Sequence, residues 1–161
     1  MKQSNIEFNL SGEFNLLRII FYSLAAVPLM HIVIVSSGVL TAPSMPSELA
    51  EGDFFRILVG VALLLSVVAP NVRKLLLGKS NGQRNQLPQD LFSRYKVAVI
   101  ISLVLWDAVA TIGLIGAALL GDVTACYSLS MLALAGMFFA RPKEQELVDL
   151  SRERCLQAVE F

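Results

Sequence analysis

The chain is poor in the residues that soluble enzymes and nucleic-acid-binding proteins rely on. Only 16% of its 161 residues are charged, against about 25% in a typical soluble domain. Two cysteines and one histidine are too few for a zinc site of the usual ligand spacing. The formal net charge of zero gives no electrostatic reason to bind nucleic acid. We therefore expect no metal site, no cofactor and no nucleic-acid partner.

Motifs for catalysis are missing as well. The sequence has neither a glycine-rich phosphate loop nor a nucleophile paired with a base in a polar loop, so no catalytic residue is assigned. A transporter of organic solutes is usually larger and built from repeated halves. Cys126 lies in an apolar run and Cys155 in the polar tail. We expect no disulfide between them and treat both as small hydrophobic residues.

Hydrophobic residues are what the chain has in abundance. They make up 55% of the sequence, and the mean hydropathy is +0.65. Membrane-spanning helices need about 17 to 25 apolar residues, and helices satisfy their own backbone groups in lipid. Four apolar runs are long enough for such helices: residues 16–40, 54–70, 97–120 and 123–140. The sequence thus predicts an all-α chain that forms a single membrane domain.

The first apolar run has the features of a retained helix rather than a cleaved signal peptide. It is preceded by a long leader in which Lys2 and Arg18 are balanced by Glu7 and Glu13. The run itself exceeds the roughly 7 to 15 apolar residues of a signal core. We expect residues 16–40 to stay in the protein as its first span.

The charged residues between the runs predict how the chain crosses the membrane. The loop of residues 41–53 carries three acids and no base, whereas residues 71–96 carry six bases. With four spans, 12 of the 13 basic residues fall on one side, and only Arg56 falls on the other. Because basic residues stay on the cytoplasmic side, we predict a four-helix bundle with both termini cytoplasmic. We take the membrane to be a bacterial plasma membrane, with residues 141–161 as a cytoplasmic tail.

Local signals mark the ends of the last two spans. Pro88 suits the first turn of the third helix. The third and fourth runs are joined by little more than Gly121 and Asp122, which predicts a tight antiparallel hairpin. Asp122 is suited to cap the fourth helix at its N-terminus.

Asp107 interrupts the apolar run of residues 97–120 near its middle. At about 1.5 Å per residue this run spans a hydrocarbon core of about 30 Å, so the acid falls deep in the membrane. A charge at that depth costs a few kcal/mol, and it must be neutralised, paired or hydrated. Leu103 and Leu114 on the same side of the helix keep the surroundings dry and favour the neutral acid. Asp107 is therefore the first candidate for a proton or ion site.

Small residues form a stripe beside Asp107 on the same helix. At about 100° per residue the stripe is about 80° wide. It consists of Ala110, Gly113, Ala117 and Gly121. Small residues spaced four apart allow close approach of helix backbones. The stripe predicts that this helix packs against protein, and Thr111 lies just beyond Asp107 as a further candidate for the ion site.

His31 is the only histidine and lies within the first apolar run. In the predicted topology it falls within about one to two helical turns of the depth of Asp107. Such a pair is suited to relay a proton. Alternatively, the imidazole is satisfied by a backbone carbonyl or by the nearby Ser36 and Ser37. The sequence leaves both alternatives open.

The second and third runs carry a pattern seen elsewhere. A polar loop with a proline leads into a helix in which an acid is followed by alanine and, six and seven residues later, by glycine and leucine. The residues concerned are Pro88, Asp107, Ala108, Gly113 and Leu114. This pattern resembles the proteolipid subunit c of rotary ATP synthases. The second run has only Gly60 where that family has a glycine repeat, and two more helices flank the hairpin. The resemblance implies a protonatable site at Asp107 and no rotor ring.

Two functions remain open from the sequence. The first is a structural or accessory subunit of a membrane complex or homo-oligomer, in which Asp107 bonds a neighbouring helix. The second is a protein that handles protons or cations, in which Asp107 titrates. In both, the partners are the lipid bilayer and either further copies of the chain or other membrane subunits.

Overall fold

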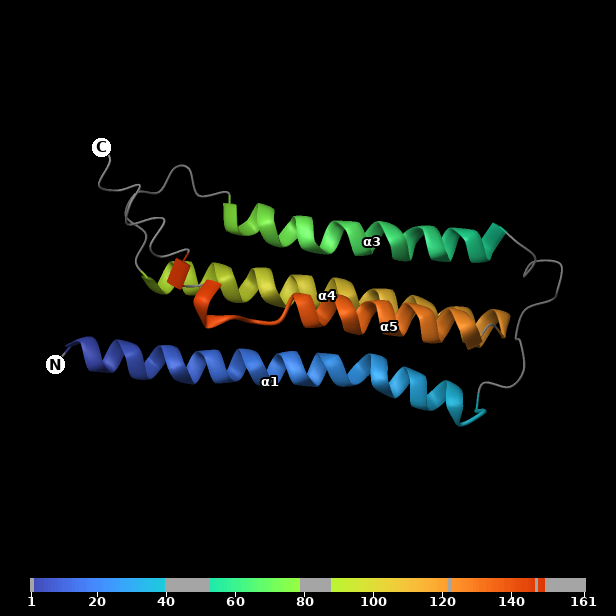
Figure 1. Cartoon of the computed structure of the whole chain (residues 1–161), viewed down its shortest axis with the longest axis horizontal. Coiled ribbons are helices and arrows are strands. Elements are labelled where there is room, and N and C mark those ends of the chain that lie inside the picture. The colour runs from blue at the N-terminus through green and yellow to red at the C-terminus, as the bar shows by residue number, and fades with distance from the viewer. Residues whose placement is uncertain (1, 40–52, 79–87, 122, 147, 150–161) are drawn as a thin grey trace.

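The computed structural model describes residues 2–39, 53–78, 88–121, 123–146 and 148–149, which are predominantly helical. These residues form four long helices: α1 (Lys2–Ser36), α3 (Asp53–Gly78), α4 (Pro88–Leu120) and α5 (Val123–Phe139). Successive helices run in opposite directions, so α1 and α4 begin at the end of the molecule where α3 and α5 finish (Figure 1). The prediction of an all-helical chain is confirmed for the residues described.

The central helix is α4. It packs along α3, α5 and α1, and α1 also packs against α5. In Figure 1, α3 and α1 lie on opposite sides of the α4–α5 pair. The helix accordingly supplies several of the fully buried side chains, among them Tyr95, Val99, Leu103 and Val109. This central position brings Asp107 next to the interior of the protein.

The first helix has different ends from those predicted. It runs from Lys2 to Ser36, and its part that is apolar enough to cross a membrane, Phe14–Ser36, begins near the predicted residue 16 and ends before the predicted residue 40. Its end is set by Gly38, whose φ of 72° lies in the left-handed region. Glycine adopts this conformation without steric cost and therefore commonly terminates helices.

The second helix extends past the end predicted at Pro70. It continues to Gly78 with the proline inside it, although proline lacks the backbone donor of an ordinary helical residue. Beside the proline, the side-chain amide of Asn71 donates to the carbonyl of Val67 at 2.8 Å. The carbonyl that loses its donor to Pro70 is that of Ser66, four residues earlier, so this hydrogen bond does not replace the missing one.

The last two helices follow the prediction closely. Pro88 is the first residue of α4, which ends at Leu120 as expected. The predicted fourth run becomes α5 and stops one residue early, at Phe139. The cap assigned to Asp122 lies outside the described residues, as do the loop from residue 40 to 52 and the tail from residue 150 onward.

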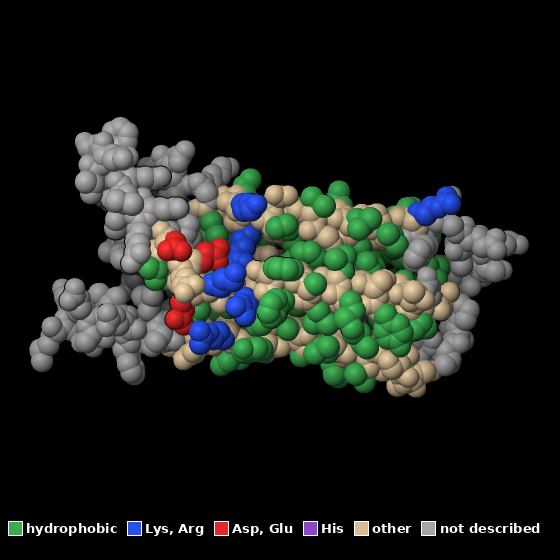
Figure 2. Space-filling model, in the orientation of Figure 1, with side chains coloured by type: hydrophobic (Ala, Val, Ile, Leu, Met, Phe, Trp, Pro, Cys, Tyr) green, Lys and Arg blue, Asp and Glu red, His purple; other side chains and the backbone are tan. Residues whose placement is uncertain are grey.

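Three of the helices are long and apolar enough to cross a membrane. These segments are Phe14–Ser36, Arg56–Leu77 and Phe92–Leu120, whereas α5 is apolar but has only 17 residues. Hydrophobic side chains cover the middle of the molecule, and lysine and arginine gather towards one end (Figure 2). Outward-facing residues such as Leu64 and Val67 are more than 60% exposed. An apolar surface of this extent would be unfavourable in water and fits a membrane protein.

Candidate functional site

Asp107 lies in the middle of α4 at the edge of its packed face. One turn to either side, Leu103 and Ala110 are fully buried, while Asp107 itself is half-buried. Leu103 and Ala110 belong to the central hydrophobic core. The carboxyl group is thus held against apolar side chains by a helix whose own position is fixed by packing on its neighbours.

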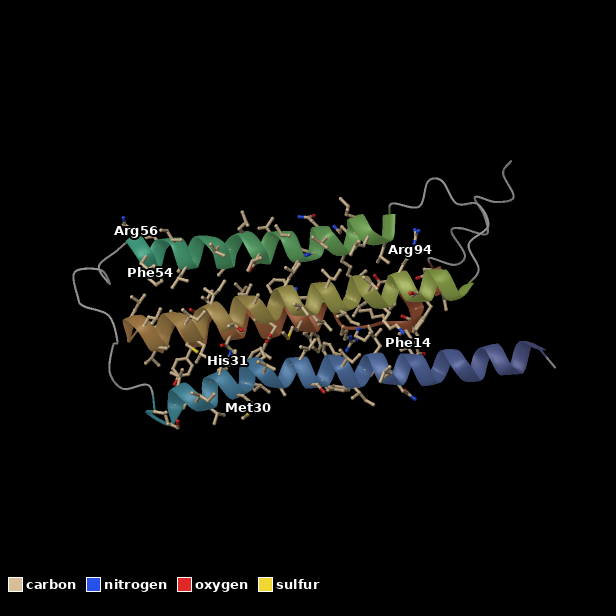
Figure 3. The ribbon with its side chains drawn as sticks, turned by 180° about the vertical axis from the view of Figure 1, so that it is seen from behind. Phe14, Met30, His31, Phe54, Arg56 and Arg94 are labelled. Carbon is tan, nitrogen blue, oxygen red and sulfur yellow. The ribbon has the colours of Figure 1, made fainter. Side chains whose placement is uncertain are left out.

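His31 comes to the same region from α1. Its side chain is only 8% exposed, whereas the preceding residue Met30 is 58% exposed. Figure 3 shows His31 on the side of α1 that faces α4, with Met30 turned away from it. The imidazole is close enough to the Asp107 carboxyl for an electrostatic interaction. The fold therefore brings together two polar groups that are far apart in the sequence.

Both groups have a buried atom without a hydrogen-bond partner. Within the described ranges, neither Oδ1 of Asp107 nor Nδ1 of His31 makes a hydrogen bond. An unpaired polar atom in the interior costs about 1–3 kcal/mol. A proton shared between the carboxyl group and the imidazole, a bridging water molecule or a small cation would provide the missing interactions. The buried atoms without partners distinguish Asp107 and His31 from residues that only form a packing contact between helices.

The nearby hydroxyl groups have other partners. Thr111 donates to the backbone carbonyl of Asp107 at 3.0 Å and not to its carboxyl group. Ser36 and Ser37 donate to the carbonyls of Ile32 and Ile34, each at 2.7 Å. Hydroxyls in helices commonly bond the preceding turn in this way. None of the three supplies His31 with a hydrogen bond, so this alternative for the imidazole is not realised by Ser36 or Ser37.

The small-residue stripe of α4 lies against α5 for most of its length. Ala110, Gly113 and Ala117 are buried. A Cβ atom built on Gly113 would lie 3.0 Å from the Leu129 Cβ atom and 3.2 Å from the Cys126 Cα atom. This close approach of two backbones has no room for a larger side chain.

Gly121 lies outside the packed part of the stripe. It follows the last residue of α4, is exposed, and has a φ of 71°. Its amide donates to the carbonyl of Ala117 at 3.0 Å. The packed stripe therefore ends at Ala117, because the chain must reverse at Gly121 through a conformation that glycine adopts readily.

Sequence reasoning missed the partner of Trp106. A Cβ atom built on Gly136 of α5 would lie 2.2 Å from Cδ2 of the Trp106 indole, so the ring occupies the space above this glycine. The aromatic ring is thereby buried within the protein next to Asp107. No local pattern connects the two residues, which lie on different helices.

A polar network at the basic end of the molecule was also missed. Arg73 of α3 donates to the Ala140 carbonyl at 3.0 Å and to the Glu146 carboxylate at 2.5 Å. The Tyr95 hydroxyl accepts from the Lys143 amide at 2.9 Å, and it can donate to the Lys143 carbonyl at 3.2 Å or to the Glu146 carboxylate at 3.3 Å. The network joins α3 and α4 to the segment that follows α5. Its hydrogen-bonded pairs are separated by 48 to 73 positions, so no sequence motif indicates it.

Metal-ligand geometry, the buried cysteine and comparison with known proteins point to no other function. Among the described residues, no three His, Cys, Asp or Glu side chains lie together as metal ligands. Cys126 is buried with its sulfur 3.9 Å from the Ser130 hydroxyl. Comparison of the chain with protein-family models, curated proteins and solved structures gives no match.

Proposed function

We propose that this chain is a multi-pass membrane protein, a four-helix bundle with both termini in the cytoplasm. The support is the asymmetry of charge along the helices. Lysine and arginine gather at the end where α3 and α5 finish (Figure 2), whereas Arg56 lies at the opposite end (Figure 3). The positive-inside rule assigns the basic end to the cytoplasm. At about 1.5 Å per residue, the 17 residues of α5 span about 26 Å, which is close to the thickness of a thin bilayer.

The function that this geometry supports best is the handling of protons or small cations at Asp107 and His31. The observation behind it is the pair of buried, unpartnered atoms on facing helices, Asp107 Oδ1 and His31 Nδ1. In a membrane interior, titratable groups of this kind are costly and mark ion pathways. A proton can reside on either group, and the carboxylate–imidazolium form has no net charge. The same role follows from the resemblance to the proteolipid subunit c.

The role of an accessory or structural subunit is the second candidate. Asp107 is only half-buried within one chain, so part of the carboxyl group remains available to a donor from another subunit. A hydrogen bond of this kind would hold the exposed part of the carboxyl group without any titration, while Oδ1 itself stays buried within the chain. The two candidates differ in whether a non-titrating amide can replace the acid.

Proton flux into vesicles tests the first candidate. The purified chain is reconstituted into liposomes that contain a pH-sensitive dye, and a pH gradient is applied in the presence of a potassium ionophore. We expect flux above that of protein-free liposomes, its loss in Asp107→Asn and His31→Gln, and its retention in Thr111→Val. The threonine is a matched control because its hydroxyl bonds only the backbone in this structure. A parent protein that conducts no faster than protein-free liposomes would contradict proton handling.

The accessory role is tested by the mass of the detergent-solubilised assembly. If Asp107 bonds another subunit, Asp107→Asn should leave the assembly intact and Asp107→Leu should dissociate it. If a monomer is found for the parent protein under mild conditions, the second candidate is excluded.

A further inference from the structure

A basic pocket lies beside the polar network, where α1 passes the segment that follows α5. It has a volume of about 430 Å³, is open to the surroundings, and is lined by Arg18, Tyr22, Arg141 and Lys143 together with Glu144 and adjoining residues. Figure 2 shows the basic side chains as a band between the apolar middle of the molecule and the acidic groups beyond. The pocket therefore lies at the level where a lipid headgroup meets the protein.

The charges of this basic pocket are not balanced from within. Glu144 pairs with Arg18 at 2.9 Å. The guanidinium of Arg141 lies 5.1 Å from the ring centre of Phe138, and it makes no ion pair with any residue that the structure describes. The backbone amide of Lys143 donates to the Tyr95 hydroxyl, and the Lys143 side chain is exposed. Two cations thus face outward on a segment whose backbone is anchored.

Exposed aromatic side chains adjoin the cations on the apolar side. Tyr22 of α1 lines the pocket and is 68% exposed, and at the end of α5 Phe138 and Phe139 are 60% and 80% exposed. Aromatic residues at this level contact the boundary between headgroups and acyl chains. Positive charge next to an apolar aromatic surface is complementary to a molecule with a negatively charged head and hydrocarbon chains.

We propose that the basic pocket binds the phosphate headgroup of an anionic phospholipid from the leaflet on the basic side of the protein. Arg141 and Lys143 contact the phosphate oxygens, and the acyl chains lie along the aromatic surface. Basic pockets beside membrane helices recognise lipid headgroups through this combination of charge and position. The site is independent of Asp107 and thus goes beyond the proposed ion handling.

Native mass spectrometry of the full chain in detergent tests the proposal. The protein is titrated with phosphatidylglycerol and, separately, with zwitterionic phosphatidylcholine. We expect preferential binding of phosphatidylglycerol and at least about a tenfold loss of affinity in the double variant Arg141→Gln/Lys143→Gln, since each basic residue contributes severalfold. Lys74→Gln is the control, because Lys74 is an exposed cation on α3 outside the pocket. The variant Arg141→Lys keeps the charge and should retain binding.

The same titration distinguishes the alternatives. Equal binding of the two lipids, or a double variant that binds like the parent, would overturn the proposal. Competition by millimolar inorganic phosphate as effective as that by the lipid would show a site for free phosphate and would also overturn it. Circular dichroism checks that each variant is folded, and if the double variant is not folded, the single variant Lys143→Gln must show severalfold weaker binding. Asp107→Asn should bind phosphatidylglycerol like the parent, which separates this site from the ion-handling proposal.

Discussion

The energetics of single residues in this protein are dominated by polar groups in apolar surroundings. The Asp107 carboxyl and the His31 imidazole each have a buried atom that makes no hydrogen bond within the described part of the chain. Since water is scarce at this depth, such groups are tolerated when they are neutral or when they compensate each other. Their position between α1 and α4 makes the protonation state of Asp107 the property most worth measuring.

Asp107 is expected to react with a membrane-soluble carbodiimide. These reagents attack the protonated carboxyl group, which is the form favoured next to apolar side chains. Mass spectrometry of the modified peptide should show a reaction that declines as the pH is raised and the acid ionises. Asp107→Asn provides the unreactive control. Modification to the same extent at every pH would contradict a titrating carboxyl group.

Gly136→Ala is expected to destabilise the protein because its Cβ would lie 2.2 Å from the Trp106 ring. Forcing an extra methyl group into a packed core typically costs about 1–3 kcal/mol. Thermal unfolding in detergent measures the change. At Gly60 an added Cβ meets nothing within 4 Å, so Gly60→Ala should be neutral or slightly stabilising. Equal unfolding temperatures for the two variants would rule out the tight Trp106–Gly136 contact.

Between elements, α4 and α5 approach each other closely. This approach depends on the absence of a side chain at Gly113, where a Cβ atom would lie 3.0 to 3.3 Å from atoms of Leu129, Cys126 and Ala125. Close backbone approach of this kind supplies the van der Waals contacts that hold helices together in lipid. The hairpin is therefore sensitive to bulk on one face of α4 only.

Gly113→Leu is expected to weaken folding by several kcal/mol, because a leucine would separate the two helices. Ile115→Leu is the control, since Ile115 lies two residues away and is partly exposed on another face of α4. The yield of monodisperse protein and its unfolding temperature measure both effects. If Gly113→Leu unfolds like the control, the stripe does not form the helix contact.

The polar network around Arg73 connects α3 and α4 to the segment after α5. The Arg73 side chain is 12% exposed and pairs with Glu146, and its guanidinium lies 5.9 Å from the ring centre of Tyr95. Arg73→Gln is expected to destabilise the protein by about 1–3 kcal/mol, because partly buried acceptors lose a charged donor. Unfolding of Arg73→Gln, Glu146→Gln and the double variant forms a thermodynamic cycle. Strictly additive losses would show that the pair contributes nothing, and the exposed Lys74→Gln controls for loss of charge.

At the scale of the whole molecule, the directions of the helices and the distribution of charge indicate the same topology. The start of α1 and the end of α5 lie at the same end as the basic band (Figures 1 and 2). Only an even number of crossings places both at one side of a membrane, which makes α5 the decisive helix. Its 17 residues are fewer than those of the other three.

Cysteine labelling tests the proposed topology directly. In a variant with Cys126→Ala and Cys155→Ala, we expect Val39→Cys to react with an impermeant reagent added to intact cells and Gln145→Cys to react only after lysis. Both positions are exposed and lie at opposite ends of the molecule. The background without cysteine must stay unlabelled. Labelling of Gln145→Cys from outside would show that the orientation is wrong or that α5 does not cross.

Much of the fold could be predicted because helix formation in a membrane depends on local composition. Apolar runs, Pro88 and the Gly121–Asp122 turn predicted four helices whose ends are within a few residues of the observed ones for α4 and α5. The ends of α1 and α3 were predicted less well. Pro70 does not end α3, because proline removes only one backbone hydrogen bond and the helix also packs along α4.

The sequence by itself determined that Asp107 lies near the middle of a long apolar helix and that Gly113 belongs to a packing face, since periodicity and length suffice for both. Only the tertiary structure decided that α1 lies beside α4 and that the His31 imidazole is buried on the side of α1 that faces it. It also decided that Trp106 covers Gly136 and that Arg73 reaches Glu146. These contacts join distant positions, and the angle and offset at which helices pack follow from side-chain shape along the whole interface rather than from any local pattern.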